Sequence, residues 1–227
     1  MLSPNSMLDQ KLREYIQVNG FKPGNRLPIH SELCKILNVG SRPLREALGV
    51  LGRQGIIETH RRGGTVLATP SVKELNEPIA WQLERRGYSF DDLVKARAMM
   101  ESEVAAEAAK VRNAQDLLVI LSAIEKMEVI SSSGSDAENA DEAFHLAILQ
   151  ATHNPVMLVF GQLIDAQFKR KIPGTFYKSA KRMQESIKEH KLIYSYIEKR
   201  KPEAARKFMY NHIMYMSEKK ARVTESR

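Results

Sequence analysis

The chain has 227 residues, of which 43% are hydrophobic and 27% are charged, a composition typical of a globular protein with room for two modest domains. No apolar run approaches the ~20 residues of a membrane-spanning helix, and the N-terminal segment lacks the apolar stretch of a secretory signal. The single cysteine, Cys34, excludes an intramolecular disulfide framework, so we expect a cytoplasmic protein.

The positive charge is concentrated near the N-terminus. The whole chain has a net charge of +8, and residues 1–70 alone hold ten Lys or Arg against five Asp or Glu. A compact basic unit suggests a polyanionic partner, and nucleic acid is favoured over a membrane because no basic amphipathic stripe is present. The alternative is a charge that serves only solubility.

The first 70 residues combine short helices with a β-hairpin. Helices are predicted near Ser6–Val18, Ser31–Leu37 and Ser41–Arg53, separated by turn-rich segments. Two β-rich runs follow on either side of 61–64, which indicates a small hairpin. This order of elements predicts a winged helix-turn-helix over residues 1–70.

The remaining residues, 71–227, carry only helical periodicity. We expect one all-α bundle here, so the fold class is mainly α, with a small β-hairpin wing in the N-terminal domain. The predicted helices lie near 73–87, 89–111, 114–130, 137–152, 155–169, 178–198 and 202–222.

The third predicted helix has one apolar and one basic side. Its apolar stripe consists of Leu44, Ala47, Leu48 and Leu51, and its other side carries Arg42, Arg45, Gly49 and Arg53. Arginines in the first turns of an exposed helix can enter the major groove and bind guanine through two hydrogen bonds. We therefore interpret this helix as a recognition helix, the alternative being a solvated charged face.

The ends of the third helix and the hairpin tip supply further predicted DNA contacts. Ser41 is expected to cap the third helix and Gly55 to end it. The hairpin tip presents Arg61 and Arg62, which suit phosphates or a minor groove. The predicted DNA-binding residues are Ser41, Arg42, Arg45, Arg53, Arg61, Arg62, Gly63 and Thr65.

The motifs "KPGNRLP", "PLREALGVLGRQGII" and "GGTV" resemble, in combination, the DNA-binding domain of GntR-family bacterial transcription regulators over about residues 8–68. The resemblance implies double-stranded operator DNA as the partner. The chain departs from the family pattern at 27–31, where Leu-Pro-Ile-His-Ser lacks an arginine that often contacts phosphates. The Ser-Arg pair is displaced by one position, so Arg45 is the firmer candidate for base contact.

Three histidines lie within predicted apolar stripes. Asp141 and His145 stand four residues apart on the apolar side of one helix. His190 and His212 occupy the apolar stripes of two later helices. A single inward histidine is usually a satisfied core residue, but three with a carboxylate would each need a buried partner. One divalent metal would satisfy all four, and this mixed nitrogen and oxygen set favours zinc, with nickel or manganese also suitable.

The C-terminal half resembles the helical ligand-binding domain called FCD, found in the FadR branch of the GntR family. In that domain metal is commonly held by an aspartate and a histidine four residues apart and by single histidines on two later helices. The matching positions are Asp141, His145, His190 and His212. The resemblance implies a small organic or sugar acid as the effector. We also expect a homodimer, because one DNA-binding domain covers few base pairs and a two-fold dimer matches a pseudo-palindromic operator.

An arginine interrupts another apolar stripe. Arg97 follows Leu93 on a predicted helix, and Glu101, one turn later, could simply pair with it. The other interpretation, which the resemblance favours, is that Arg97 binds the carboxylate of the effector beside the metal.

Three functions compete on this evidence. A metal-dependent enzyme is disfavoured because we find no nucleophile, paired acid and base or phosphate loop, and only Glu142 and His145 form the Glu-x-x-His spacing of a di-iron bundle. A metal-responsive regulator would use the ion as its signal. We favour an effector-responsive transcription regulator in which the metal is a fixed part of the ligand pocket.

Overall fold

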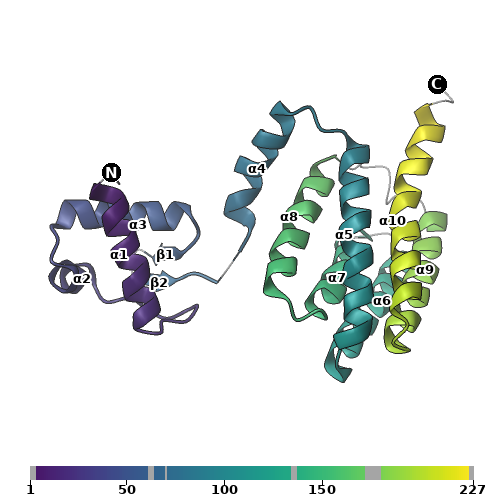
Figure 1. Ribbon diagram of the computed structural model, residues 1–227, viewed down its shortest axis with the longest axis horizontal. Helices are drawn as coiled ribbons and strands as arrows, with labels where there is room; N and C mark the ends of the chain where they lie inside the picture. The colour runs from purple at the N-terminus through teal and green to yellow at the C-terminus, as the bar shows by residue number, and fades with distance from the viewer. Residues whose placement is uncertain (1–3, 61–63, 70, 134–136, 172–179, 225–227) are drawn as a thin grey trace. The chain divides into compact units, whose positions relative to one another are not determined.

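The computed structural model describes residues 4–60, 64–69, 71–133, 137–171 and 180–224. They divide into two compact units, Met1–Ile79 and Ala80–Arg227, each with its own hydrophobic core (Figure 1). The domain boundary expected at residue 70 stays a prediction, and the division between the compact units falls within the fourth helix, Lys73–Arg85.

The N-terminal unit packs three helices and a hairpin around one core. The elements are α1 (Pro4–Val18), α2 (His30–Leu37), α3 (Ser41–Arg53), β1 (Ile57–His60) and β2 (Gly64–Leu67). The two strands are antiparallel, with Ile57 opposite Leu67 and His60 opposite Gly64. Buried apolar side chains of the three helices and β1 form the core, including Leu12, Leu33, Leu44, Leu51 and Ile57. Leu67 of β2 is partly buried and packs against it. The predicted winged helix-turn-helix is confirmed.

Of the two predicted ends of α3, the structure confirms the C-terminal one and not the N-terminal cap. Gly55 has φ +66° and its N–H donates to the Gly52 carbonyl at 3.0 Å, so it ends the helix as predicted. The prediction that Ser41 caps the helix is wrong. Ser41 is already the first helical residue, and the cap position falls to Gly40, which is extended at φ −71° and ψ 158° and has no side chain to cap with.

Beyond the hairpin, the described residues form helices joined by short connections. The helices are α4 (Lys73–Arg85), α5 (Phe90–Val111), α6 (Ala114–Ser133), α7 (Ala137–Gln150), α8 (Pro155–Lys171), α9 (Ala180–Glu198) and α10 (Pro202–Thr224). The predicted fold class, a mainly α protein with an all-α C-terminal bundle, is confirmed.

Helix α5 lies between α8 and α10 and packs along both (Figure 1). It begins with a capping box, in which the Ser89 hydroxyl accepts from the Asp92 N–H at 3.1 Å and the Asp92 carboxylate accepts from the Ser89 N–H at 2.8 Å. Small residues such as Ala105 and Ala109 are fully buried, which lets neighbouring helices approach closely. The capped start and close packing of α5 therefore fix the positions of the side chains that it presents to the bundle interior.

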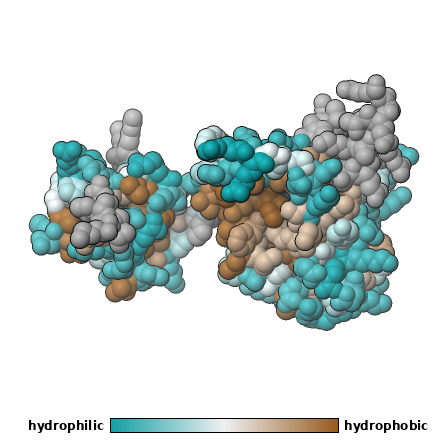
Figure 2. Space-filling view, turned by 45° about the horizontal axis from the view of Figure 1, so that its top comes forward, coloured by the Kyte–Doolittle hydropathy of each residue, from teal (hydrophilic) through white to brown (hydrophobic). Residues whose placement is uncertain are grey.

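One face of the helical unit carries apolar surface (Figure 2). On α8, Val156, Val159 and Phe160 are 59%, 41% and 55% exposed, and their spacing places them on one side of the helix. Among the described residues, no helix is long and apolar enough to cross a membrane.

Candidate metal centre and nucleic-acid interface

Helix α3 presents its basic side to solvent. Leu44, Ala47 and Leu51 are buried in the core of the N-terminal unit, so the opposite side of the helix faces outward. The side chain of Arg42 is 90% exposed, and its Nε lies 3.2 Å from Glu46 Oε1. The other predicted residues of this side, Arg45, Gly49 and Arg53, are also exposed. The face is thus accessible along its whole length.

A hollow of about 1070 Å³ lies between α3 and the hairpin. Arg45 and Gly49 line it from α3, and Thr65 lines it from β2. Further polar side chains that no sequence pattern indicates also line this hollow, among them Arg26, His60 and the acidic Glu58. The hairpin-tip candidates Arg61, Arg62 and Gly63 lie outside the described residues.

The four predicted metal ligands come together in the helical unit. Asp141 and His145 extend from α7, His190 from α9 and His212 from α10. Each offers one ligand atom, and these four atoms lie within 4.8 Å of one another. All four residues are buried, with exposures between 0% and 3%. The i,i+4 spacing on α7 brings a carboxylate and an imidazole to one side of that helix, as the sequence indicated.

The inner nitrogens of this cluster crowd one another. His190 Nε2 lies 3.1 Å from His212 Nε2 and 3.5 Å from Asp141 Oδ1. His145 Nε2 lies 3.8 Å from Asp141 Oδ2, and this buried nitrogen has no hydrogen-bond partner among the described residues. A buried nitrogen that points into a cluster of donors without a partner fits a metal ligand. The residues present therefore fit a divalent ion.

Two carboxylates that no local sequence pattern links to the metal site contact the outer nitrogens of two of the imidazoles. Glu101 on α5 pairs with His145 Nδ1, and Glu189 Oε2 on α9 lies 2.6 Å from His212 Nδ1. Sequence separations of 44 and 23 residues hide these contacts from local patterns. Carboxylates in this position are typical of metal-bound histidines.

The surroundings shift the pKa values of two carboxylates, Glu101 and Glu189, and of two imidazoles, His190 and His212, toward the protonation states that a metal site needs. Burial would raise the pKa of Glu101, but its interactions with the Arg97 guanidinium and the His145 imidazole outweigh burial and hold the pKa at about 2. Glu189 likewise has a pKa of about 2, because hydrogen bonds from His212 and Arg182 outweigh burial. Burial lowers the pKa of His190 well below its usual value, and it also lowers that of His212, where Glu189 opposes the change. Ionised carboxylates and neutral imidazoles are the forms that bind metal.

Arg97 lies beside this cluster in a buried ion pair. Its Nε is 2.5 Å from Glu101 Oε1, its guanidinium carbon lies 4.6 Å from the centre of the Phe168 ring, and the residue is 1% exposed. An Nη atom lies 3.9 Å from Asp165 Oδ1. The pairing with Glu101 that the sequence allowed is therefore present, and contact with an effector stays a prediction.

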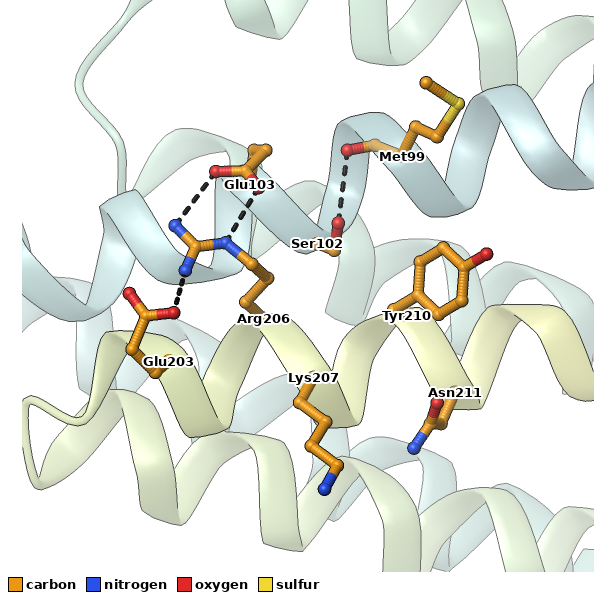
Figure 3. Close-up of a pocket in the computed structure, with 8 residues that line it drawn as sticks. All are labelled: Met99, Ser102, Glu103, Glu203, Arg206, Lys207, Tyr210 and Asn211. Carbon is orange, nitrogen blue, oxygen red and sulfur yellow. Dashed lines mark hydrogen bonds and ion pairs between the residues drawn. The ribbon is translucent and has the colours of Figure 1, made fainter.

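A second hollow, of about 680 Å³, lies on the outside of the helical unit between α5 and α10 (Figure 3). Three of its charged side chains pair with one another, since Arg206 donates to Glu103 at 2.7 and 3.0 Å and also contacts Glu203 (Figure 3). None of the predicted effector or metal residues lines it. The buried cluster is thus the stronger candidate for a ligand site.

Comparisons with known proteins agree with the geometry of both units. Residues 4–67 match the family described as bacterial regulatory proteins of the gntR family, and residues 92–214 match the FCD domain. The chain belongs to the GntR family. It is therefore a DNA-binding transcription regulator with an FCD domain, and not an enzyme, as the sequence predicted.

Relatives of this GntR-family chain are regulators of bacterial operons. It is 31% identical to the Glc operon transcriptional activator of Escherichia coli K12 over 200 residues, which cover 85% of this chain and 79% of the relative. It is 26% identical to the galactonate operon transcriptional repressor of the same strain over 192 residues, 82% of each chain. The structure of Streptococcus agalactiae GntR superposes with a TM-score of 0.78 at 22% identity, over 92% of this chain and 97% of that one, which shows a shared fold.

Proposed function

We propose that this GntR-family regulator changes its affinity for operator DNA when a small carboxylate metabolite binds beside a divalent metal in the FCD domain. The observation that carries the proposal is the buried cluster of Asp141, His145, His190 and His212, with ligand atoms within 4.8 Å of one another. A bound divalent ion would supply positive charge and open coordination positions for the oxygens of an acid.

The ligand set favours zinc, with nickel or manganese also suitable. Three imidazole nitrogens and one carboxylate oxygen suit borderline ions, and occupancy follows metal availability and geometry as much as intrinsic affinity. One relative is named the galactonate operon transcriptional repressor, and galactonate is a sugar acid. This supports small organic or sugar acids as the class of effector for this chain.

We further propose that Arg97 contributes to the binding of the effector carboxylate. Its guanidinium is buried beside the cluster and reaches it through Glu101, which pairs with His145. Because Nε of Arg97 already donates to Glu101, an effector carboxylate would accept hydrogen bonds from the Nη side of the guanidinium.

At the operator, we propose that Arg42, Arg45 and Arg53 of α3 enter the major groove, with Ser41 near the groove at the start of the helix. Arg61, Arg62, Gly63 and Thr65 of the hairpin would contact phosphates or the minor groove. The exposed basic side of α3 and the hollow beside it support this assignment.

We also propose that the protein binds as a homodimer. One reading head covers few base pairs, and a two-fold dimer matches half-sites about one helical turn apart in a pseudo-palindromic operator. The exposed apolar side of α8, with Val156, Val159 and Phe160, supports an interface in the helical domain. Sedimentation at micromolar concentration should show a dimer, and a monomer both with and without DNA would contradict this.

Operator titrations test the proposed regulation. Operator binding is measured by fluorescence anisotropy at fixed salt with metal-loaded protein, with chelated protein, and with metal-loaded protein plus candidate acids. The proposal predicts that an acid changes operator affinity and that the change requires metal. If metal removal alone changes affinity and no acid does, the ion is the signal and the protein is a metal-responsive regulator.

A further inference from the structure

Two of the three clustered imidazoles are fixed from outside by carboxylates. His145 pairs through Nδ1 with Glu101, and His212 Nδ1 lies 2.6 Å from Glu189 Oε2. In both rings Nε2 is then the nitrogen nearest the cluster. A carboxylate at Nδ1 keeps the proton on that nitrogen, so the lone pair of Nε2 faces the other ligands.

Each of these carboxylates is itself held by a guanidinium. Arg97 Nε donates to Glu101 at 2.5 Å, and Arg182 donates to both oxygens of Glu189 at 3.2 and 3.0 Å. Both arginines also lie against aromatic rings, Arg97 over Phe168 and Arg182 over Tyr215 at 4.3 Å. Two Arg–Glu–His chains therefore approach the cluster, one from α5 to α7 and one from α9 to α10.

The third imidazole is held differently. His190 is stacked on Phe144 with ring centroids 3.8 Å apart, and within the described ranges its Nδ1 has no hydrogen-bond partner. Its orientation is thus set by packing and by the short distance to His212, whereas a charged acceptor fixes the other two rings. The contrast shows that a buried histidine in this core does not need a carboxylate at its outer nitrogen.

We propose that Glu101 and Glu189 are positioning residues of the metal site, each fixing Nε2 of one ligand imidazole inward and strengthening it as a donor. Arg97 and Arg182 hold these carboxylates in place. This inference rests on the proposed metal site and adds residues that act on it without touching the ion. Loss of an outer carboxylate typically lowers metal affinity about 10–100-fold.

A purely structural role makes a different prediction. If the two carboxylates only satisfied buried histidines, their neutralisation would lower stability, while zinc affinity of the folded protein would stay the same. Glutamine keeps the volume and one acceptor oxygen of glutamate but removes its charge. Glu101→Gln and Glu189→Gln therefore separate the two roles.

The experiment measures zinc affinity of the full chain by competition with a chromophoric chelator. The control variant is Glu103→Gln, which removes the same charge from the same helix at a residue that faces outward to Arg206 (Figure 3). Thermal unfolding without metal confirms that each variant is folded. We expect Glu101→Gln and Glu189→Gln to bind zinc about 10–100-fold more weakly than the parent, and Glu103→Gln to bind within about twofold of it.

The outcomes separate this inference from the proposed function. A parent that binds no zinc contradicts the metal site itself. A parent that binds zinc, with folded Gln variants that bind it equally well, overturns the positioning role and leaves the metal site standing. If Glu101→Gln does not fold, Glu189→Gln decides the matter, because the side chain of Glu189 is 35% exposed and tolerates the change more readily.

Discussion

Replacing His190 with alanine should abolish the stabilisation of the helical unit by metal. His190 is 0% exposed, so without metal the substitution opens a cavity that costs about 2–5 kcal/mol. The substitution also removes a buried nitrogen, Nδ1, that has no hydrogen-bond partner among the described residues. Removing this unsatisfied group offsets about 1–3 kcal/mol of the loss. The midpoints of these two ranges, about 3.5 and about 2 kcal/mol, leave a modest net loss of unfolding free energy without metal, about 1.5 kcal/mol.

Metal should raise the unfolding free energy of the parent but not that of His190→Ala. At a free metal concentration of 100 Kd, binding adds about 2.7 kcal/mol to the unfolding free energy of the parent. A unit of about 150 residues gains about 2–4 °C in Tm per kcal/mol, so the parent should gain about 5–11 °C. The variant, lacking a ligand, should gain less than about 2 °C.

The assay is thermal unfolding of both proteins with and without zinc, followed by circular dichroism. Ile193→Ala is the matched control, because Ile193 is also 0% exposed on α9 but does not belong to the cluster. This control should lose stability through its cavity and keep the full metal-induced gain. An equal gain in His190→Ala and the parent would refute the assignment of His190 as a ligand.

Three further predictions follow from the two units. Arg45→Ala should weaken specific operator binding by about 1–3 kcal/mol and relax selectivity at one base pair, and unchanged binding at matched salt would contradict the assignment of α3. Arg97→Lys keeps the charge but loses the planar fork, so effector affinity should fall in isothermal titration while bound metal stays at the parent level; unchanged effector affinity would leave Arg97 only its ion pair with Glu101. Metal-free protein should lose stability as pH falls below ~6.5, because the lowered pKa values of His190 and His212 let the unfolded chain bind protons that the folded chain rejects. This contribution is constant above ~6.5, and equal urea midpoints at about pH 7.5 and 5.5 would contradict it.

Helical periodicity carried most of the fold prediction. The inward positions of His190 and His212 could be predicted because every apolar stripe identifies the side of a helix that packs against others. The spacing of Asp141 and His145 added a chemical reason to interpret these positions together. The ligand atoms meet only because α7, α9 and α10 pack together, which the sequence does not show directly. The site could still be predicted, because three histidines and an aspartate are unusual in an apolar core.

The sequence was less informative where side chains meet across long separations. Glu189 directly precedes His190 in the chain, but it pairs with His212 on α10, which no local period indicates. The spacing of Glu101 indicates only a pairing with Arg97, because its contact with His145 depends on the packing of α5 against α7. The cap of α3 was mispredicted because a serine beside a helix start is a strong signal, and the helix begins one residue earlier than that signal implies.

The most direct test of the metal centre is elemental analysis of protein purified without a His-tag. After incubation with zinc and desalting, the parent should retain about one equivalent of metal per chain, and His190→Ala and His212→Ala should each lose most of it. Both variants should still bind operator DNA through the N-terminal unit. A parent without metal after this treatment would contradict the metal centre and would make the three buried histidines ordinary residues of the core.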